Sequence, residues 1–190
     1  GMTEDELWSI LHKTNIEHGG EWIECRILSS GVRTNPWMQE SSNKIIQSGE
    51  IVSFDTDMVG PYGYCADISR TYVEGNKFSE SQKKLYLMAV EQINHNSRLI
   101  KPGISFKEFT QKSWVLPEEY FGNRYSVMVH GIGLCDEWPA IRYPTDGGER
   151  SGVFETNMTI TVESYIGKVG GKEGVKLEQQ YLVGQNGLEL

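Results

Sequence analysis

Acidic residues inside strand-like stretches constrain this chain more than any other feature. Residues 52–59 have the composition of a β-strand, yet they include Asp55 and Asp57. Because strand side chains alternate between two faces, both carboxylates are expected to project to the same side. A turn and a second strand at residues 64–72 then bring Asp67 back toward them. Three carboxylates in one hairpin would repel one another unless a cation neutralised them.

Two later strand-like stretches each contribute a glutamate. Residues 158–163 alternate apolar and polar side chains and end on Glu163, which is typical of a half-buried strand. Residues 175–183 form another such stretch and contain Glu178. Carboxylate oxygens and one imidazole, that of His130, suit iron, manganese, zinc or cobalt, and bridging carboxylates favour a pair of ions. The sequence therefore predicts one centre for divalent metal ions, with the candidate ligands Asp55, Asp57, Asp67, His130, Glu163 and Glu178.

Four short motifs carry a family resemblance. They are Gly63-Tyr-Cys-Ala-Asp-Ile-Ser-Arg-Thr71, His130-Gly-Ile-Gly-Leu134, Thr161-Val-Glu163 and Leu177-Glu178. In residues and in order they resemble the creatinase, aminopeptidase P and methionine aminopeptidase family, which has the pita-bread fold. The resemblance implies an α+β fold in which helices flank a curved antiparallel sheet. It also implies metal ligands, which correspond to Asp55 or Asp57 and to Asp67, His130, Glu163 and Glu178.

Two departures from the family pattern change the expected chemistry. The family separates its first two aspartate ligands by eleven residues, whereas Asp55 lies twelve residues before Asp67 and Asp57 lies ten before it. Peptidases of the family place a second histidine about seven residues after the first, and Glu137 occupies that position here. Where several relatives have a histidine after a proline, this chain has Trp37. The groups that would serve a peptidase intermediate are therefore replaced.

Both main departures resemble one branch of the family, the metal-dependent dimethylsulfoniopropionate lyases of marine bacteria. That branch has the doubled aspartate and a Cys-Asp-Glu-aromatic-Pro continuation, found here at residues 135–139. It also has a tyrosine five residues before the histidine, which is Tyr125 here. The resemblance implies β-elimination from a small zwitterionic substrate, giving dimethyl sulfide and acrylate. Such a reaction forms no tetrahedral intermediate and needs no second histidine.

An elimination requires a base and a place for the departing sulfonium group. Asp136 is the candidate base, Glu137 is the alternative base, and Tyr125 is a further catalytic candidate. Asp136 also has a structural interpretation, as the cap of a turn or the partner of an arginine. A sulfonium cation has no hydrogen-bond donor, so aromatic faces suit it, at about 0.5–2 kcal/mol each. The candidate aromatic contacts are Trp37, Tyr62, Tyr64 and Trp138.

Several further expectations concern packing and organisation. Helices are predicted from a capping box at residues 3–6 to residues 18–20, from Ser79 to residues 101–103, and onward from Ser105. A strand is predicted around residues 22–28, a loop at residues 142–152, and Arg70 is expected to orient a carboxylate ligand. The resemblance implies a single catalytic domain at residues 1–190 that lacks the first helix and the N-terminal domain of its relatives, and a homodimer.

Composition narrows the remaining function classes. A chain of 190 residues can bury a sizeable core, and 38% hydrophobic residues is typical of soluble proteins. A net charge of −8 argues against nucleic-acid binding and is compatible with a zwitterionic ligand. No apolar run approaches the roughly 20 residues of a membrane span, and three cysteines without metal-like spacing favour the cytoplasm. A carbon–sulfur lyase is favoured over a metallohydrolase of the Xaa-Pro dipeptidase or creatinase kind and over an inactive metal-binding protein.

Overall fold

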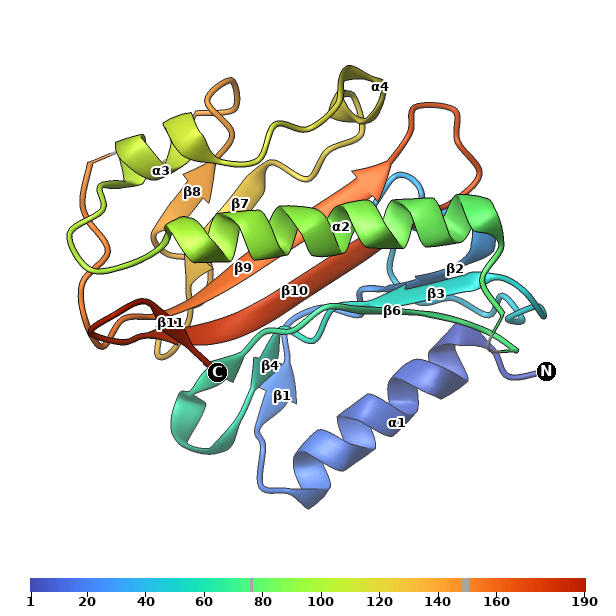
Figure 1. Ribbon diagram of the computed structural model, residues 1–190. Helices are drawn as coiled ribbons and strands as arrows, with labels where there is room; N and C mark the ends of the chain where they lie inside the picture. The colour runs from blue at the N-terminus through green and yellow to red at the C-terminus, as the bar shows by residue number, and fades with distance from the viewer. Residues whose placement is uncertain (76, 148–150) are drawn as a thin grey trace.

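The computed structural model describes residues 1–75, 77–147 and 151–190. Its largest sheet has five antiparallel strands in the order β11-β10-β9-β7-β8, and two three-stranded sheets have the orders β2-β3-β6 and β1-β4-β5 (Figure 1). The strands are β1 Trp22–Ile23, β2 Leu28–Ser30, β3 Ile51–Phe54, β4 Met58–Val59, β5 Cys65–Ala66, β6 Arg70–Val73, β7 Val127–Gly131, β8 Ala140–Arg142, β9 Thr159–Gly167, β10 Gly174–Val183 and β11 Leu188–Glu189. The predicted α+β class with a curved antiparallel sheet and flanking helices is confirmed.

The α-helices flank these sheets and begin where the capping signals predict. They are α1 Glu4–Glu17, α2 Glu80–Leu99, α3 Phe106–Lys112 and α4 Glu118–Phe121, with short 3-10 helices at Gly31–Thr34 and Pro61–Gly63. Thr3 caps α1, Ser79 caps α2 and Ser105 caps α3 through side-chain oxygens that accept backbone N–H bonds. The predicted helices at these three positions are confirmed, whereas α4 was not predicted.

Replacing the cap of α2 is expected to destabilise the protein modestly. The Gln82 N–H donates to Ser79 Oγ at 3.3 Å, and the Ser79 N–H donates to Gln82 Oε1 at 2.8 Å. Ser79→Ala removes the first of these bonds, so we expect a loss of about 1 kcal/mol in the free energy of unfolding, measured by urea denaturation. Ser79→Asp keeps a cap acceptor and should retain stability; equal losses in both variants would contradict the capping role.

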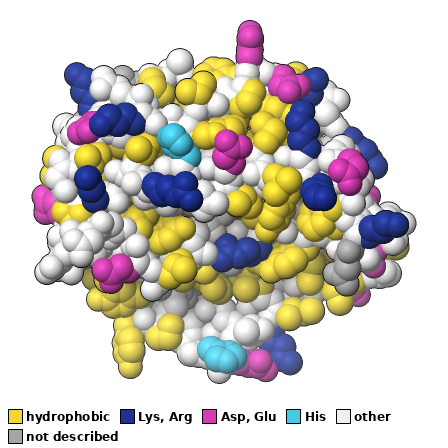
Figure 2. Space-filling view, in the orientation of Figure 1, with side chains coloured by type: hydrophobic (Ala, Val, Ile, Leu, Met, Phe, Trp, Pro, Cys, Tyr) yellow, Lys and Arg dark blue, Asp and Glu magenta, His cyan; other side chains and the backbone are white. Residues whose placement is uncertain are grey.

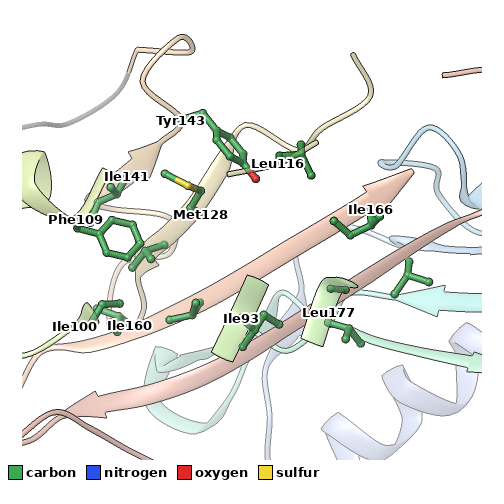
Figure 3. Close-up of a cluster of buried hydrophobic side chains, with 14 of the residues drawn as sticks. Ile93, Ile100, Phe109, Leu116, Met128, Ile141, Tyr143, Ile160, Ile166 and Leu177 are labelled. Atoms are coloured by element: carbon green, nitrogen blue, oxygen red, sulfur yellow. The ribbon is translucent and has the colours of Figure 1, made fainter. Parts of the chain in front are cut away.

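Alternation along β9 and β10 separates a core face from a polar face. Ile160, Val162 and Ile166 of β9 pack with Val175 and Leu177 of β10 in the main hydrophobic cluster, which α2 covers (Figures 1 and 3). Residues at the intervening positions therefore project from the opposite face of the sheet. That opposite face carries Thr161, Glu163, Lys176 and Glu178. The core packing thus fixes the direction of both predicted glutamate ligands.

A second, smaller cluster packs α1 against the sheet β2-β3-β6. Trp8 of α1 lies with Leu28, Ile46 and Val52 in this cluster, and Figure 1 shows α1 below the strands β2, β3 and β6. The view in Figure 2 shows the α2 face, where acidic and basic side chains of the described residues are interspersed among hydrophobic ones. That face therefore presents no single broad patch of one charge.

The predicted hairpin is interrupted at the positions of its acidic residues. Strand β3 pairs with β6 and strand β4 pairs with β5, but residues 55–57 and 67–69 lie between these pairings. The Thr56 hydroxyl accepts a bond from the Ile68 N–H at 2.8 Å and donates to the Ala66 carbonyl at 3.2 Å. The prediction of one continuous strand carrying Asp55 and Asp57 is therefore wrong, because a side-chain bridge replaces the backbone ladder there.

Two other local predictions differ from the structure. Residues 22–28 contain all of β1 and the first residue of β2, which lie in different sheets, rather than one strand. Within the predicted loop at residues 142–152, Arg142 is the last residue of β8, and residues 148–150 lie outside the described residues. The strands β8 and β11 were not predicted, since each is at most three residues long.

Candidate metal centre

Five of the six candidate ligands converge from different parts of the fold. Glu163 and Glu178 are directly opposite each other in the antiparallel pair of β9 and β10. His130 lies on the neighbouring strand β7, while Asp55 follows β3 and Asp67 precedes β6. Each of these five residues is at most 6% exposed. Residues from the interrupted hairpin and from the polar face of the large sheet therefore lie together in one buried acidic group.

The distances show how compact this group is. His130 Nε2 lies 3.0 Å from Glu178 Oε1, 3.4 Å from Asp67 Oδ2 and 3.8 Å from Glu163 Oε1. In each of three sets among the described residues, the ligand atoms lie within 4.8 Å of one another. They come from His130, Glu163 and Glu178, from Asp55, Asp67 and Glu178, and from Asp67, His130 and Asp136. Two overlapping sets that share Glu178 are an arrangement in which one carboxylate can bridge two ions.

Asp57 lies beside this group but outside all three compact sets. Its backbone has a φ of 33°, and its carboxylate accepts a hydrogen bond from the Cys25 thiol at 2.7 Å. Burial, followed by the negative charge of Asp55, raises the pKa of Asp57 to about 7. The negative charge of Asp55 therefore acts on Asp57, while the Cys25 thiol donates a hydrogen bond to the Asp57 carboxylate.

The donor set fits a divalent cation. Asp67 Oδ1 and Glu163 Oε1 are buried and have no hydrogen-bond partner among the described residues. Such buried unpaired oxygens are costly unless a ligand satisfies them. His130 Nδ1 lies 3.0 Å from the Gly131 carbonyl oxygen, to which it can donate, so that Nε2 is directed at the acidic residues. Oxygen donors with one imidazole nitrogen suit iron, manganese, zinc or cobalt.

The metal-free centre retains protons that its ligands must lose. Burial is the main cause that raises the pKa of Glu163 to about 8. Burial, followed by the negative charges of Asp55 and Glu178, raises the pKa of Asp67 to about 10. Burial alone would lower the pKa of His130, but hydrogen bonds to Asp67 and Glu178 outweigh it and raise that pKa to about 12. Metal binding must therefore release protons.

The stabilisation by metal should consequently depend on pH. The pKa of Glu163 is raised in the folded protein from its ordinary value of 4.5 to about 8. The protonated form of Glu163 therefore stabilises the metal-free fold fully below pH 4.5, and this stabilisation is lost as the pH rises toward about 8. A metal ion requires the deprotonated form, so we expect the metal-induced increase in Tm to grow between pH 6 and pH 8.5. Scanning fluorimetry with and without manganese measures this increase; a constant increase across that range would contradict the proton release.

Lys176 is a member of this centre that the sequence analysis missed. Its Nζ lies 2.8 Å from Glu178 Oε2, 3.0 Å from Glu163 Oε2 and 3.2 Å from Asp55 Oδ2, and the residue is 1% exposed. Burial alone would lower the pKa of Lys176, but these three carboxylates hold it well above its ordinary value. Period-two alternation in Val175-Lys-Leu-Glu178 places Lys176 on the same face as Glu178, and this was the available signal.

Arg70 does not have the role predicted for it. Its guanidinium donates to the backbone carbonyl of Glu178 at 2.5 Å and to Gln179 Oε1 at 2.6 Å, rather than to a ligand carboxylate. The Ser69 hydroxyl instead donates to Glu178 Oε2 at 2.9 Å. The groups that orient the carboxylate of Glu178 are therefore Ser69 and Lys176, and Arg70 fixes the backbone of β10.

Asp136 lies close to His130, and contacts link it through Glu137 to Tyr125. Asp136 Oδ1 accepts a bond from the Glu137 N–H at 2.8 Å and lies 3.9 Å from His130 Nδ1. Burial is the main cause that raises the pKa of Asp136 above its ordinary value. The Tyr125 hydroxyl lies 3.3 Å from Glu137 Oε1, to which it can donate. Asp136 thus caps a local turn, as one structural alternative predicted, while it also faces the centre.

The candidate aromatic residues divide into two groups. Trp37 is buried with its ring centroid 6.1 Å from that of Tyr165, and Lys176 Nζ lies 5.8 Å from the Trp37 ring and 5.4 Å from the Tyr125 ring. The other three candidates, Tyr62, Tyr64 and Trp138, are exposed at the surface. Trp37 and Tyr125 thus have rings near the ammonium of Lys176, a residue of the centre.

The fold and the acidic centre together define a protein of the pita-bread metalloenzyme class. The chain matches the metallopeptidase family M24 over residues 1–185 and belongs to this family. It is 44% identical over 191 residues to a dimethylsulfoniopropionate lyase DddP of Roseovarius nubinhibens, covering 98% of this chain and 43% of that relative. It is 42% identical to the lyase of the same name from Roseobacter denitrificans, covering 100% of this chain and 43% of the relative.

Solved structures agree on the fold. An Xaa-Pro dipeptidase from Bacillus anthracis superposes with a TM-score of 0.85 at 27% identity, covering 100% of this chain and 52% of that one. A prolidase from Pyrococcus furiosus gives a TM-score of 0.84 at 27% identity, covering 100% of this chain and 55% of that one. The chain therefore spans about half the length of the relatives that it matches. Among the described residues, no helix has the length and apolar character needed to cross a membrane.

Proposed function

We propose that this protein is a metal-dependent lyase that converts dimethylsulfoniopropionate into dimethyl sulfide and acrylate. The observation that carries the proposal is the 44% identity to a lyase of that name over 98% of the chain. The continuation of the His130 motif supports the same reading, because Glu137 stands where the peptidases of the fold have a histidine. The site therefore lacks the group that a peptidase uses on its intermediate and keeps the groups that an elimination needs.

The metal centre of this proposal is a pair of divalent ions, with iron, manganese, zinc and cobalt as the candidates. Its ligands are Asp55, Asp57, Asp67, His130, Glu163 and Glu178. When bound, the metal would supply a Lewis acid that holds the substrate carboxylate and acidifies the adjacent carbon. Every other step belongs to side chains of the chain itself.

Asp136 is the base in this proposal. Its carboxylate takes a proton from the carbon next to the substrate carboxylate, and the electron pair of that C–H bond forms the C=C bond of acrylate. The C–S bond breaks, and its electron pair leaves with sulfur as neutral dimethyl sulfide. A raised pKa strengthens Asp136 as a base, and its place beside His130 brings it to the ligand group. Glu137 is the alternative base, one residue further along the chain.

Tyr125 and the aromatic residues position the substrate. Burial raises the pKa of Tyr125, so its hydroxyl stays neutral and can donate a hydrogen bond. The rings of Trp37 and Tyr125 both lie near Lys176 beside the ligand group, where an aromatic face can meet a sulfonium cation. The proposed aromatic contacts are Trp37, Tyr62, Tyr64 and Trp138.

The proposed organisation is one catalytic domain at residues 1–190, acting in the cytoplasm as a homodimer. Large hydrophobic side chains at the surface support the association of two copies, since exposed apolar area favours an interface. They include Trp22, Met38 and Leu134. Light scattering after size-exclusion chromatography measures the mass, and a monomer at micromolar concentration would overturn the dimer.

The test of the lyase is a direct assay of product. The purified protein is loaded separately with iron, manganese and zinc, incubated with dimethylsulfoniopropionate, and analysed for dimethyl sulfide by gas chromatography. A proline dipeptide is tested in parallel, since the Xaa-Pro dipeptidase at 27% identity makes a hydrolase the competing function. Dimethyl sulfide that disappears with a chelator supports the lyase. Dipeptide cleavage alone, or no product from metal-loaded protein, overturns it.

A further inference from the structure

We propose that Lys176 competes with metal for one side of the centre, so that its two metal positions fill with unequal affinity. The inference rests on the metal-binding part of the proposed function and is independent of the lyase reaction. Lys176 comes from β10, two residues before Glu178, and its ammonium lies among carboxylates from three segments of the chain. It is thus a fixed internal cation inside a group of metal-type ligands.

The contacts of Lys176 exhaust its hydrogen-bonding capacity. Its Nζ reaches Ser69 Oγ at 2.7 Å, Glu178 Oε2 at 2.8 Å, Glu163 Oε2 at 3.0 Å and Asp55 Oδ2 at 3.2 Å. An ammonium group has only three N–H donors, and four oxygens surround this one. The side chain is therefore held within the centre from several directions.

Lys176 divides the oxygens of the two glutamates unequally. It takes Oε2 of both Glu163 and Glu178, whereas Oε1 of each glutamate faces His130 Nε2, at 3.8 Å and 3.0 Å. Glu163 Oε1 has no hydrogen-bond partner among the described residues, and neither has Asp67 Oδ1. Glu163 Oε1 is thus available to a metal ion on the side of His130, while Oε2 of both glutamates and Asp55 Oδ2 are already engaged by an ammonium.

The free-energy cost of binding a metal ion therefore differs between the side of His130 and the side of Asp55. On the side of His130, a metal ion meets the unpaired Glu163 Oε1 and displaces no ammonium group. On the side of Asp55, Lys176 must give up contacts to three carboxylates or share them with a second cation at short range. Like charges repel strongly at such separations in a buried site. The position near His130 is therefore expected to fill first, and Lys176 weakens the position near Asp55.

Removing the charge of Lys176 should have opposite effects on two measurable quantities. Lys176→Met keeps a long unbranched side chain but leaves the carboxylates without their counter-cation, so the Tm of metal-free protein should fall. The same change frees three carboxylate oxygens, so the affinity for the second metal ion should rise. A residue that only holds the fold together would lower both quantities when replaced. The opposite signs therefore distinguish competition from a structural role.

The experiment titrates metal-free protein with cobalt and follows both heat and the visible absorption of cobalt, which reports its coordination. The wild type should bind one ion at least tenfold more tightly than the second. In Lys176→Met the second affinity should rise at least tenfold while the Tm of metal-free protein falls. Lys176→Arg keeps the charge and should resemble the wild type, and Lys176→Gln serves as a second neutral variant if the methionine variant does not fold.

The outcomes separate the failure of this inference from the failure of the metal centre. Equal affinities for two ions in the wild type overturn the inference, as does an unchanged or weakened second affinity in the neutral variants. A wild type that binds no cobalt overturns the metal centre itself, and the inference with it. Because every readout is a binding or stability measurement, the result is independent of whether dimethylsulfoniopropionate is the substrate.

Discussion

Asp136→Asn is expected to abolish dimethyl sulfide release while leaving the metal content unchanged. The amide has nearly the shape of the carboxylate but cannot accept the proton, and general bases typically contribute about 10²–10⁴-fold to the rate. Asp136 lies at the edge of the ligand group, 3.9 Å from His130 Nδ1, rather than among the oxygens around Lys176. Gas chromatography of the product and elemental analysis of the same preparation measure the two quantities together.

The neighbouring carboxylate provides the control for this prediction. Glu137→Gln should retain most of the rate if Asp136 is the base, because Glu137 contacts Tyr125 and only its backbone N–H reaches Asp136. Equal activity in Asp136→Asn and wild type would refute the role of Asp136. A selective loss in Glu137→Gln would transfer that role to Glu137.

The local signals in the sequence were sufficient for most of the helices and long strands. The capping residues Thr3, Ser79 and Ser105 predict where three helices begin, because Ser and Thr oxygens accept hydrogen bonds from otherwise unpaired backbone N–H groups. Alternation identifies β9 and β10, since one face packs under α2 and the other is polar. These features depend on neighbouring residues alone, and they were therefore predictable.

The details of the metal centre depend on distant contacts and were harder to predict. The strand-like composition of residues 52–59 gives no indication that β3 ends at Phe54, because the Thr56 side chain replaces backbone ladder bonds across the hairpin. Lys176 is not predicted from ligand types alone, because lysine is not a usual metal ligand, although a buried cluster of carboxylates requires a counter-charge. Arg70 is expected from the sequence to orient a carboxylate ligand, whereas its partners include the Glu178 carbonyl and Gln179 Oε1.

His130→Ala is expected to remove metal binding as well as activity. His130 is the only histidine in the acidic group of the described residues, and its Nε2 lies within 4 Å of three carboxylates. Loss of groups that merely support a ligand typically costs about 10–100-fold in affinity, so loss of the ligand itself should cost at least roughly 100-fold. Elemental analysis and cobalt titration measure this loss.

The same substitution separates the metal centre from the general stability of the fold. In metal-free protein the imidazole is an ion-pair partner of Asp67 and Glu178, so His130→Ala should also lower the Tm without metal. Added metal should then restore little stability, because binding is weak. His95→Ala is the matched control, since His95 is exposed and contacts only the Lys112 carbonyl among the described hydrogen bonds. If His130→Ala keeps full metal content and a normal metal-induced rise in Tm, the centre does not use this imidazole, and the ligand set must be rebuilt on the carboxylates alone.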